Sequence, residues 1–472
     1  MSTYWCEWAW LGSTDGVVAQ GVVIEVVGDR ISAITSGALS PPSKSVLLRG
    51  VTLPGMVNGH SHGFHRALRG RTHGEQGSFW TWRNQMYALA DRLNPDTYRA
   101  LATAAYAEMV LAGFTSVGEF HYLHHQTGGV PYADPNEMSN ALIEAAASAG
   151  IRITLLDTCY LQAGLTDNAG LTHNAGLTHT IQAHNAGSTE PHAELGPTQQ
   201  RFSDGNVDRW IERVEAADIA SPTAKLGAAI HSVRAVPRKA IATIATWSKT
   251  RDLPLHAHVS EQPAENEQCL AAHGLTPTEL LHQEGALTPS FTAVHATHLS
   301  THDHLLYAQS GAMCCICPTT ERDLADGIGP TALLRSAGVP LSIGSDSHAL
   351  IDPFEEVRSI EMNQRLASLV RGTHQPGELL AMATSVGALS IGWPDAGKIA
   401  PGALADFITV SLDSPRLAGT DSNQLAAALV FSGSAADVDH VVIGGRVVVS
   451  SRTHHQIDVT QALRSSIQQL WS

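Results

Sequence analysis

The spacing of apolar positions divides this chain into three parts. Residues 1–50 consist of short apolar or alternating stretches separated by turns, as in Gly21–Val27 and Arg30–Ile34, and contain no stretch of helical period. This spacing is typical of short β-strands. The same pattern returns near the other end of the chain, in Gly402–Val410 and Val438–Val449. We therefore expect the two ends of the chain to pair into one small β-sandwich.

Between these ends, short apolar runs alternate with stretches in which apolar residues recur at the helical period of about 3.6 residues. The eight apolar runs are Val51–Asn58, Phe114–Phe120, Ile151–Thr158, Lys225–Ile230, Leu253–Val259, Phe291–Ala296, Ala312–Cys317 and Pro340–Gly344. The helical patterns between them include Thr97–Leu111, Glu137–Ala149, Val207–Ala217, Arg238–Lys249 and Glu355–Val370. Strands that alternate with helices favour a parallel sheet, and eight such units predict a barrel.

The predicted fold class is therefore α/β: a (β/α)8 TIM barrel with a small β-sandwich formed by both chain ends. We expect residues 1–52 and 400–472 to form the sandwich and residues 53–399 to form the catalytic barrel. The chain has 472 residues, of which 43% are hydrophobic, and this is enough to bury a large core.

Polar side chains gather at or just beyond the end of every apolar run. They are His60 and His62; Glu119, His121 and Tyr122; Asp157 and Tyr160; His231 and Arg234; His258 and Glu261; His295 and His298; Thr319, Thr320 and Glu321; and Asp346 and His348. The carboxyl ends of all strands in such a barrel open on one face, where active sites lie. Histidines scattered at random would not follow the strand ends, so the pattern predicts an active site.

The first strand end carries a His-x-His motif, His60-Ser61-His62. Residues i and i+2 of a strand point to the same face, so these imidazoles would form half of a metal site. Alone the motif is weak, because a chain with 25 histidines contains such spacings by chance. His258 at the fifth strand end and Asp346 at the eighth complete a set of three imidazoles and one carboxylate. That set suits Zn²⁺ or Fe²⁺ with one position left for water.

Three further residues belong to this prediction. His256 is in phase with His258 but lies one step deeper, so we expect it in the core or behind the metal ligands. Glu261 follows the fifth strand end, where its carboxyl would face a substrate. His295 ends the sixth strand, where its ring would hydrogen-bond the metal-bound water.

Composition and charge exclude several classes of protein. Acidic residues outnumber Lys and Arg by 44 to 29, a formal net charge of −15, so nucleic acid is a poor partner. No apolar run reaches the roughly 20 residues of a membrane span, and no signal peptide is recognisable. Six cysteines do not form a disulfide framework, and Cys314, Cys315 and Cys317 share one apolar run that favours a strand interior over a metal site. We therefore expect a cytoplasmic protein with reduced thiols.

Several sequence blocks carry a family resemblance. They are Pro54-Gly55, His60–Ala67, Phe79–Arg83, Glu119–Tyr122, His231–Val236, His258–Gln262, Val294–His298, Cys317–Glu321 and Ser345-Asp346. The metal motifs among them resemble the amidohydrolase superfamily, in its mononuclear deaminase branch. The remaining blocks are similar to the enzymes of this branch that act on N-formimino-L-glutamate in histidine degradation. The resemblance covers nearly the whole chain.

The resemblance implies a role for each candidate residue. It implies metal ligands at His60, His62, His258 and Asp346, catalytic groups at Glu261, His295 and Asp346, and substrate-binding groups at Arg83, Tyr122, His231 and Arg234. It also implies one divalent metal ion per chain, Zn²⁺ or Fe²⁺, and a homodimer. Binuclear relatives use a bridging modified lysine on the fourth strand, but Lys225 stands at the wrong end of that strand. His65 replaces a glutamine common in the family and is a candidate for the pocket wall.

The substrate implied is a small dicarboxylate, N-formimino-L-glutamate, which would be hydrolysed to N-formyl-L-glutamate and ammonia. Arginine forks suit carboxylates, although Arg83 and Arg234 would equally serve structural salt bridges.

Two rival interpretations of the site remain. One is another deaminase, for guanine, adenosine-type or triazine compounds; the other is an inactive barrel that only binds. A six-residue repeat within residues 163–187 predicts an expanded loop, and a metal-storage role for its His173, His179 and His184 is a third, weaker rival.

Overall fold

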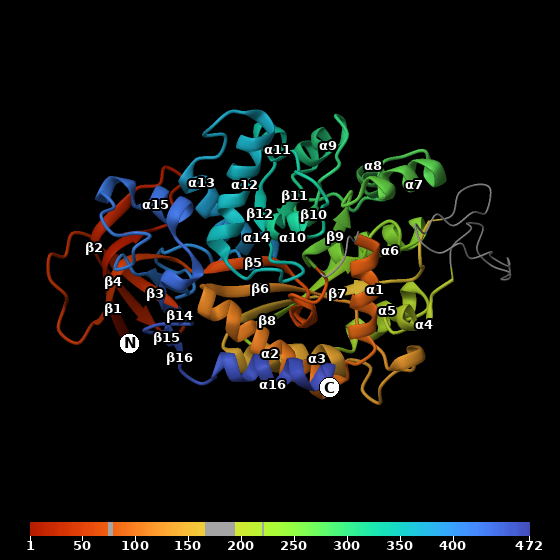
Figure 1. Ribbon diagram of the computed structural model, residues 1–472, viewed down its shortest axis with the longest axis horizontal. Coiled ribbons are helices and arrows are strands. Elements are labelled where there is room, and N and C mark those ends of the chain that lie inside the picture. Colours follow the sequence, from red (N-terminus) through yellow and green to blue (C-terminus); the bar gives the residue numbers. More distant parts are fainter. Residues whose placement is uncertain (74–78, 166–193, 220) are drawn as a thin grey trace.

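A computed structural model describes residues 1–73, 79–165, 194–219 and 221–472. Its central feature is a sheet of eight parallel strands that follow one another in chain order (Figure 1). The strands are β5 Met56–Ser61, β6 Phe114–His121, β7 Arg152–Cys159, β8 Ala224–Ile230, β9 Leu255–Val259, β10 Phe291–His295, β11 Met313–Ile316 and β12 Leu341–Ile343. A parallel bridge between Ser61 and Asp346 joins the first strand to the end of the last. The predicted (β/α)8 barrel is confirmed.

The two ends of the chain form a second eight-stranded sheet, at the left of Figure 1. Its strands are β1 Ser2–Trp10, β2 Val18–Val27, β3 Arg30–Thr35, β4 Val46–Pro54, β13 Phe407–Val410, β14 Val438–Ile443, β15 Arg446–Ser450 and β16 Thr453–His454. Strand β4 lies at the centre, between β1 from its own end of the chain and β13 from the other. The predicted pairing of the chain ends is confirmed.

The predicted first barrel strand, Val51–Asn58, was wrong in its bounds. The chain crosses there from one sheet to the other: β4 ends at Pro54 in the small sheet, and β5 begins at Met56 in the barrel. Gly55 makes the crossing, donating its N–H to the carbonyl of Asp406. A Cβ on Gly55 would lie 2.2 Å from the hydroxyl of Thr115, so only glycine fits this junction. The division into domains at residues 52 and 400 stays a prediction.

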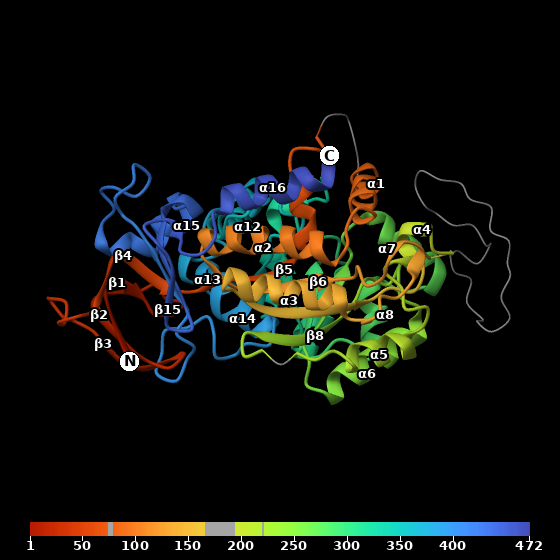
Figure 2. The same ribbon diagram turned by 90° about the horizontal axis from the view of Figure 1, so that it is seen from below.

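The helices surround the barrel, except α15, which lies beside the small sheet (Figures 1 and 2). They are α1 Phe79–Ala90, α2 Pro95–Ala112, α3 Glu137–Ala149, α4 Pro197–Gln200, α5 Val207–Glu215, α6 Arg238–Thr250, α7 Pro263–His273, α8 Pro277–Gln283, α9 Asp303–Ser310, α10 Pro318–Asp323, α11 Thr331–Ser336, α12 Pro353–Ser368, α13 Pro376–Ala381, α14 Gly387–Ser390, α15 Leu425–Ser432 and α16 Val459–Trp471. The five helical patterns predicted from the sequence correspond to α2, α3, α5, α6 and α12.

The last helix leaves the small sheet and packs on the barrel, beside α2 (Figure 2). The indole N–H of Trp471 donates to the carbonyl of Ala67 at 3.1 Å, and Arg92 donates to the carbonyl of Leu470 at 2.8 Å. The C-terminus therefore braces the segment that follows the His-x-His strand.

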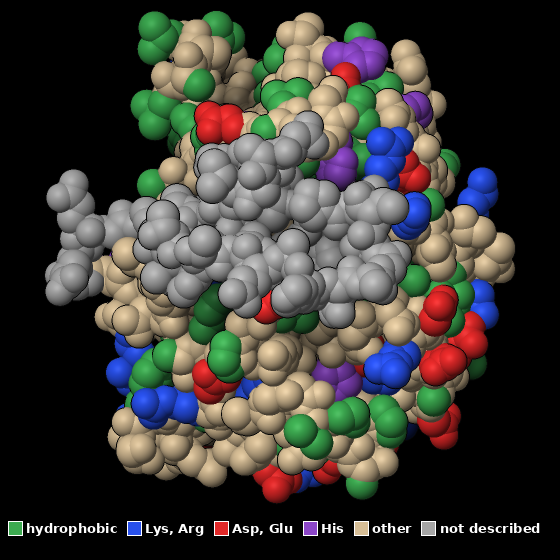
Figure 3. Space-filling view, turned by 90° about the vertical axis from the view of Figure 1, so that its right-hand side faces the viewer, with side chains coloured by type: hydrophobic (Ala, Val, Ile, Leu, Met, Phe, Trp, Pro, Cys, Tyr) green, Lys and Arg blue, Asp and Glu red, His purple; other side chains and the backbone are tan. Residues whose placement is uncertain are grey.

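The structure also bears on the predictions about membrane-spanning helices, surface charge and the cysteines. Among the described residues, none of the helices combines the length and the apolar character needed to cross a bilayer. Acidic and basic side chains are interspersed on the face shown in Figure 3. Cys314 and Cys315 are buried within β11, as the strand-interior interpretation predicts, whereas Cys317 is buried but lies just after the strand, at the beginning of α10. The histidines of the repeat, His173, His179 and His184, lie outside the described residues.

Candidate active site

Four side chains converge at the carboxyl end of the barrel, at the predicted metal site. His60 and His62 come from β5, His258 comes from β9, and Asp346 follows β12; one ligand atom from each lies within 4.8 Å of the others. The Nε2 atom of His60 is 3.2 Å from Nε2 of both His62 and His258. Asp346 Oδ1 lies 3.4 Å from His60 Nε2 and 3.3 Å from His62 Nε2. We call these four residues the ligand group.

The imidazoles of the ligand group have the orientation and the neutral charge that binding a cation requires. His62 Nδ1 lies 3.0 Å from the carbonyl of Phe120, and His258 Nδ1 lies 2.9 Å from the carbonyl of His231. A carbonyl accepts only, so each Nδ1 carries the proton and each Nε2 turns its lone pair inward. Burial is the main cause that lowers the pKa of all three histidines, so they are neutral. Neutral imidazoles and a carboxylate fit a divalent ion such as zinc.

A buried hydrogen-bond chain fixes the His-x-His strand from behind. Ser61 points to the opposite face from its neighbours and donates to Glu119 Oε2 at 2.7 Å, while the N–H of Gly63 donates to Oε1 at 2.6 Å. The ring of His348 lies 3.0 Å from the Ser61 hydroxyl. Burial raises the pKa of Glu119 to about 7. Glu119 and His348 were both predicted at the strand ends, and they support the ligand group rather than line the pocket.

Two ionisable side chains, His295 and Glu261, lie beside the ligand group and line the pocket. His295 Nε2 is 3.7 Å from Glu261 Oε1 and 3.8 Å from Asp346 Oδ2, and His295 Nδ1 is 3.6 Å from Glu321. Burial raises the pKa of Glu261. Burial opposes protonation of His295, but Glu261 and the other two carboxylates outweigh it and raise its pKa to about 10. For Asp346, burial is outweighed by His295 and the neighbouring imidazoles, which lower its pKa. The arrangement can hold and move a proton beside the ligand group.

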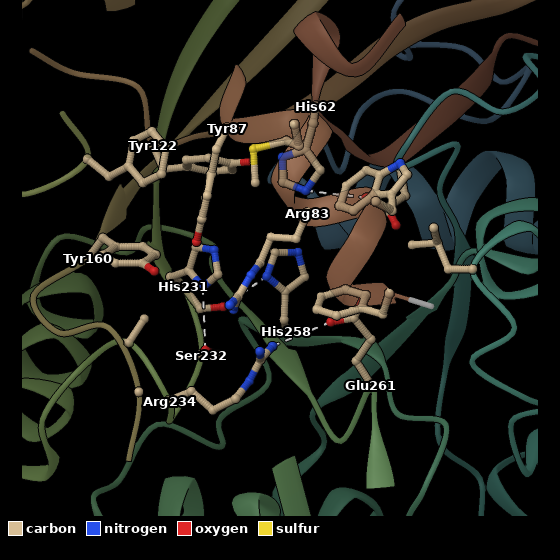
Figure 4. A pocket seen from close by; sticks show the side chains of 18 of the residues that line it. His62, Arg83, Tyr87, Tyr122, Tyr160, His231, Ser232, Arg234, His258 and Glu261 are labelled. Carbon is tan, nitrogen blue, oxygen red and sulfur yellow. Dashed lines mark hydrogen bonds and ion pairs between the residues drawn. The ribbon is translucent and has the colours of Figure 1, made fainter. Parts of the chain in front are cut away.

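The pocket in front of these groups contains the four predicted substrate-binding residues (Figure 4). Arg83 reaches it from α1, and Tyr122, His231 and Arg234 reach it from the segments that follow β6 and β8. Arg234 also lies 3.5 Å from Glu261 and 3.7 Å from Glu265. The structural salt bridge considered for Arg234 is therefore present, in the same place where its guanidinium faces the pocket.

Sequence reasoning missed much of the pocket wall. The additional lining residues include Phe79, Trp82, Met86, Tyr87, Phe202 and Gln268. Tyr87 stands four residues after Arg83 and therefore on the same face of α1, so helical spacing could have found it. His65 also lines the pocket, with Nε2 3.1 Å from the hydroxyl of Tyr122. Phe202 is near the pocket only through the tertiary fold, and no sequence signal marks it.

Other predicted polar residues lie elsewhere. His121 and Asp157 belong to a buried cluster behind the pocket, where Arg213 donates to both oxygens of Asp157 at 2.9 and 2.8 Å. His256 lies in the core, with Nε2 2.8 Å from the carbonyl of Ser390, as predicted. Lys225 donates to the carbonyl of Gly392 and stacks on Trp393. It lies at the beginning of β8, away from the ligand group, as a site without a bridging lysine requires.

Known proteins resemble this chain in sequence and in structure. The model of the amidohydrolase family matches residues 51–448. The chain is 35% identical to a formimidoylglutamate deiminase of Pseudomonas aeruginosa over 93% of this chain and 91% of that protein. It is 27% identical to a 5'-deoxyadenosine deaminase of Methanothermobacter thermautotrophicus, over 92% and 90% of the two chains.

A crystal structure of an amidohydrolase from Brucella melitensis superimposes on the whole chain. The TM-score is 0.87, the identity is 30%, and all of both chains is covered. The family model spans the ligand group, Glu261 and His295, so the matched region contains every group of the site. The chain therefore belongs to the amidohydrolase family and is a metal-dependent hydrolase of carbon–nitrogen bonds.

Proposed function

We propose that the protein hydrolyses N-formimino-L-glutamate to N-formyl-L-glutamate and ammonia. The observation that carries this proposal is the presence of two arginines, Arg83 and Arg234, in one pocket with the ligand group. They come from different elements and face the same space in Figure 4. A substrate with two carboxylates matches two guanidinium forks. The 35% identity with a formimidoylglutamate deiminase points to the same substrate.

The proposed reaction assigns a task to each group beside the pocket. A divalent ion held by the ligand group would supply hydroxide by lowering the pKa of a bound water molecule. Asp346 is placed to take up the proton that the water loses, and the protonated ring of His295, 3.8 Å from Asp346 and 3.7 Å from Glu261, is placed to pass a proton on. Glu261, whose pKa burial raises, is suited to pass a proton to the imine nitrogen of the substrate. Water adds to the formimino carbon, the bond from that carbon to the imine-derived nitrogen breaks, and ammonia leaves.

We propose that His60, His62, His258 and Asp346 hold one ion per chain, with Zn²⁺ favoured over Fe²⁺. Three imidazoles and one carboxylate are common zinc ligands, and this set leaves room for a water molecule. We also propose Tyr122 and His231 as hydrogen-bonding partners of the substrate, since both line the same pocket. Glu261, His295 and Asp346 are the proposed catalytic residues.

The direct test is ammonia release from N-formimino-L-glutamate by the purified protein, with the metal content measured on the same sample. We expect ammonia and N-formyl-L-glutamate in equal amounts, with about one ion per chain. A protein that binds metal but releases no ammonia would refute the substrate and retain the family. Purine deaminase activity, tested with adenosine-type compounds and guanine, would then favour the alternative, for which the aromatic side chains of Tyr87 and Phe202 offer stacking surfaces.

Replacing Arg83 with methionine should raise KM far more than it lowers kcat. A charge-assisted hydrogen bond contributes about 1.5–3 kcal/mol, which corresponds to roughly 10–150-fold in kcat/KM. The loss should fall on KM because a carboxylate remote from the reacting carbon is bound equally in ground and transition states. The matched control is Arg238→Met, which removes an arginine of α6 that pairs with Glu284 outside the pocket. An unchanged KM in Arg83→Met would exclude Arg83 from substrate binding.

We further propose a homodimer in a reducing compartment such as the cytoplasm. All six cysteines are buried free thiols, which supports the compartment. The dimer rests on family membership, and light scattering of the metal-loaded protein measures it directly.

A further inference from the structure

A cysteine thiol lies directly behind the ligand group and has no part in the proposed reaction. Cys317 follows β11 and caps the beginning of α10. Its Sγ, a ring nitrogen of His295 and a carboxylate oxygen of Asp346 all lie within 4.8 Å of one another, and all three side chains are buried. These residues come from three consecutive strand ends, so the barrel itself brings them together.

Asp346 belongs to this cluster and to the ligand group at the same time. Its Oδ1 faces His60 and His62, at 3.4 and 3.3 Å, while its Oδ2 faces His295 at 3.8 Å. The two oxygens of one carboxylate thus point to two neighbouring positions. A bridging carboxylate is the usual connection between two metal ions about 3.5–4 Å apart.

At the second position, ion pairs with carboxylates hold the ring of His295. Neither ring nitrogen of His295 has a hydrogen-bond partner among the described residues, although the ring is 1% exposed. Three carboxylates surround it within 3.8 Å, those of Glu261, Glu321 and Asp346. Arg234 is the guanidinium that lies near them, 3.5 Å from Glu261. Buried carboxylates in this excess favour a cation.

Backbone geometry allows the sulfur to come this close. A Cβ on Gly344 would lie 3.0 Å from the sulfur of Cys317 and 2.8 Å from Cβ of His60. Any larger residue at this position would push the thiol and the His-x-His strand apart. Glycine at position 344 therefore keeps Cys317 beside the ligand group.

We propose that Cys317, His295 and Asp346 form a second, inhibitory site for a soft divalent ion such as Zn²⁺ or Cd²⁺ present in excess. A thiolate and an imidazole favour such ions over Mg²⁺ or Ca²⁺. When the ion binds, the thiol of Cys317 and one ring nitrogen of His295 each give up a proton to solvent. The ion occupies the lone pair of His295, so it blocks the proton transfer assigned to that ring. This inhibition rests on the proposed function, whereas binding of the second ion does not.

The test is a Cd²⁺ titration of protein that already holds one equivalent of Zn²⁺. We expect a second equivalent to bind and to produce an ultraviolet thiolate-to-metal charge-transfer band. Exchange of Cd²⁺ into the first site gives no such band, because the ligand group contains no sulfur. The absence of the band in the wild-type protein would refute the proposal without any variant.

Two cysteine variants localise the band. Cys317→Ser should abolish it and weaken binding of the second ion by at least about tenfold, since even loss of an outer partner typically costs that much. Cys269→Ser, which changes a buried cysteine of α7 away from this cluster, should retain both. A band that survives in Cys317→Ser would overturn the assignment. Inhibition by excess Zn²⁺, expressed relative to the rate of each variant with one equivalent, should weaken in Cys317→Ser alone.

Discussion

Replacement of Glu261 with glutamine should lower kcat by about 10²–10⁴-fold, the usual contribution of a general acid or base. Glutamine keeps the size of the side chain and its contact with Arg234 but has no proton to transfer to the imine nitrogen. The metal content should stay at one ion per chain, because Glu261 is outside the ligand group. Steady-state kinetics and metal analysis of the same preparation measure both effects.

The control for this variant is Glu265→Gln, the same change four residues later. Glu265 is buried and lies 3.7 Å from Arg234, and it accepts the backbone N–H of Glu261 at 3.3 Å. It does not line the pocket among the described residues. Its replacement should therefore affect KM more than kcat. Near-normal turnover in Glu261→Gln, or an equal loss of kcat in both variants, would remove Glu261 from proton transfer.

Replacement of His258 with alanine should abolish both metal binding and activity. The ligand group would retain His60, His62 and Asp346, but it would lose the imidazole that lies 3.2 Å from His60. One oxygen of Asp346 also faces His295, at 3.8 Å, and cannot replace the lost ligand. Loss of a metal ligand costs at least the 10–100-fold in affinity that typically follows loss of an outer partner. Zinc content after dialysis against a weak chelator measures this loss.

The matched variant is His256→Gln, on the same strand and in the same phase as His258. Its ring contacts the carbonyl of Ser390, and glutamine can still donate to that oxygen. It should lower stability and leave one metal ion per chain. If His256→Gln lost the metal and His258→Ala kept it, the assignment of the fifth-strand ligand would be reversed.

The sequence alone determined the barrel and the ligand group because both follow periodic rules. Parallel strands buried on both sides appear as short apolar runs, and their carboxyl ends must meet on one face. A residue that ends such a run, as His258 does, has its position set by local structure. The same rule predicted the position of Asp346 within the ligand group and that of His295 beside it.

Only the tertiary structure decided how residues outside that rule are placed. Arg83 lies on α1, and the helical pattern of the sequence does not show that this face of the helix points into the pocket. The junction at Gly55 depends on contacts with Asp406 and Thr115, which are distant in the sequence. The apolar pattern therefore predicted one strand where the structure has two. Arg234 lines the pocket and also forms ion pairs with two glutamates. The sequence could not decide between a substrate-binding and a structural role for it.

The same limit applies to Cys317. Its sequence context indicates a strand interior, and the cysteine is indeed buried. That its sulfur lies beside His295 and Asp346 follows from the order of β10, β11 and β12 in the closed barrel. Periodicity along the chain therefore determines which side chains point inward at a strand end, whereas the distances between strand ends, and so the chemistry shared among them, arise only when the barrel closes.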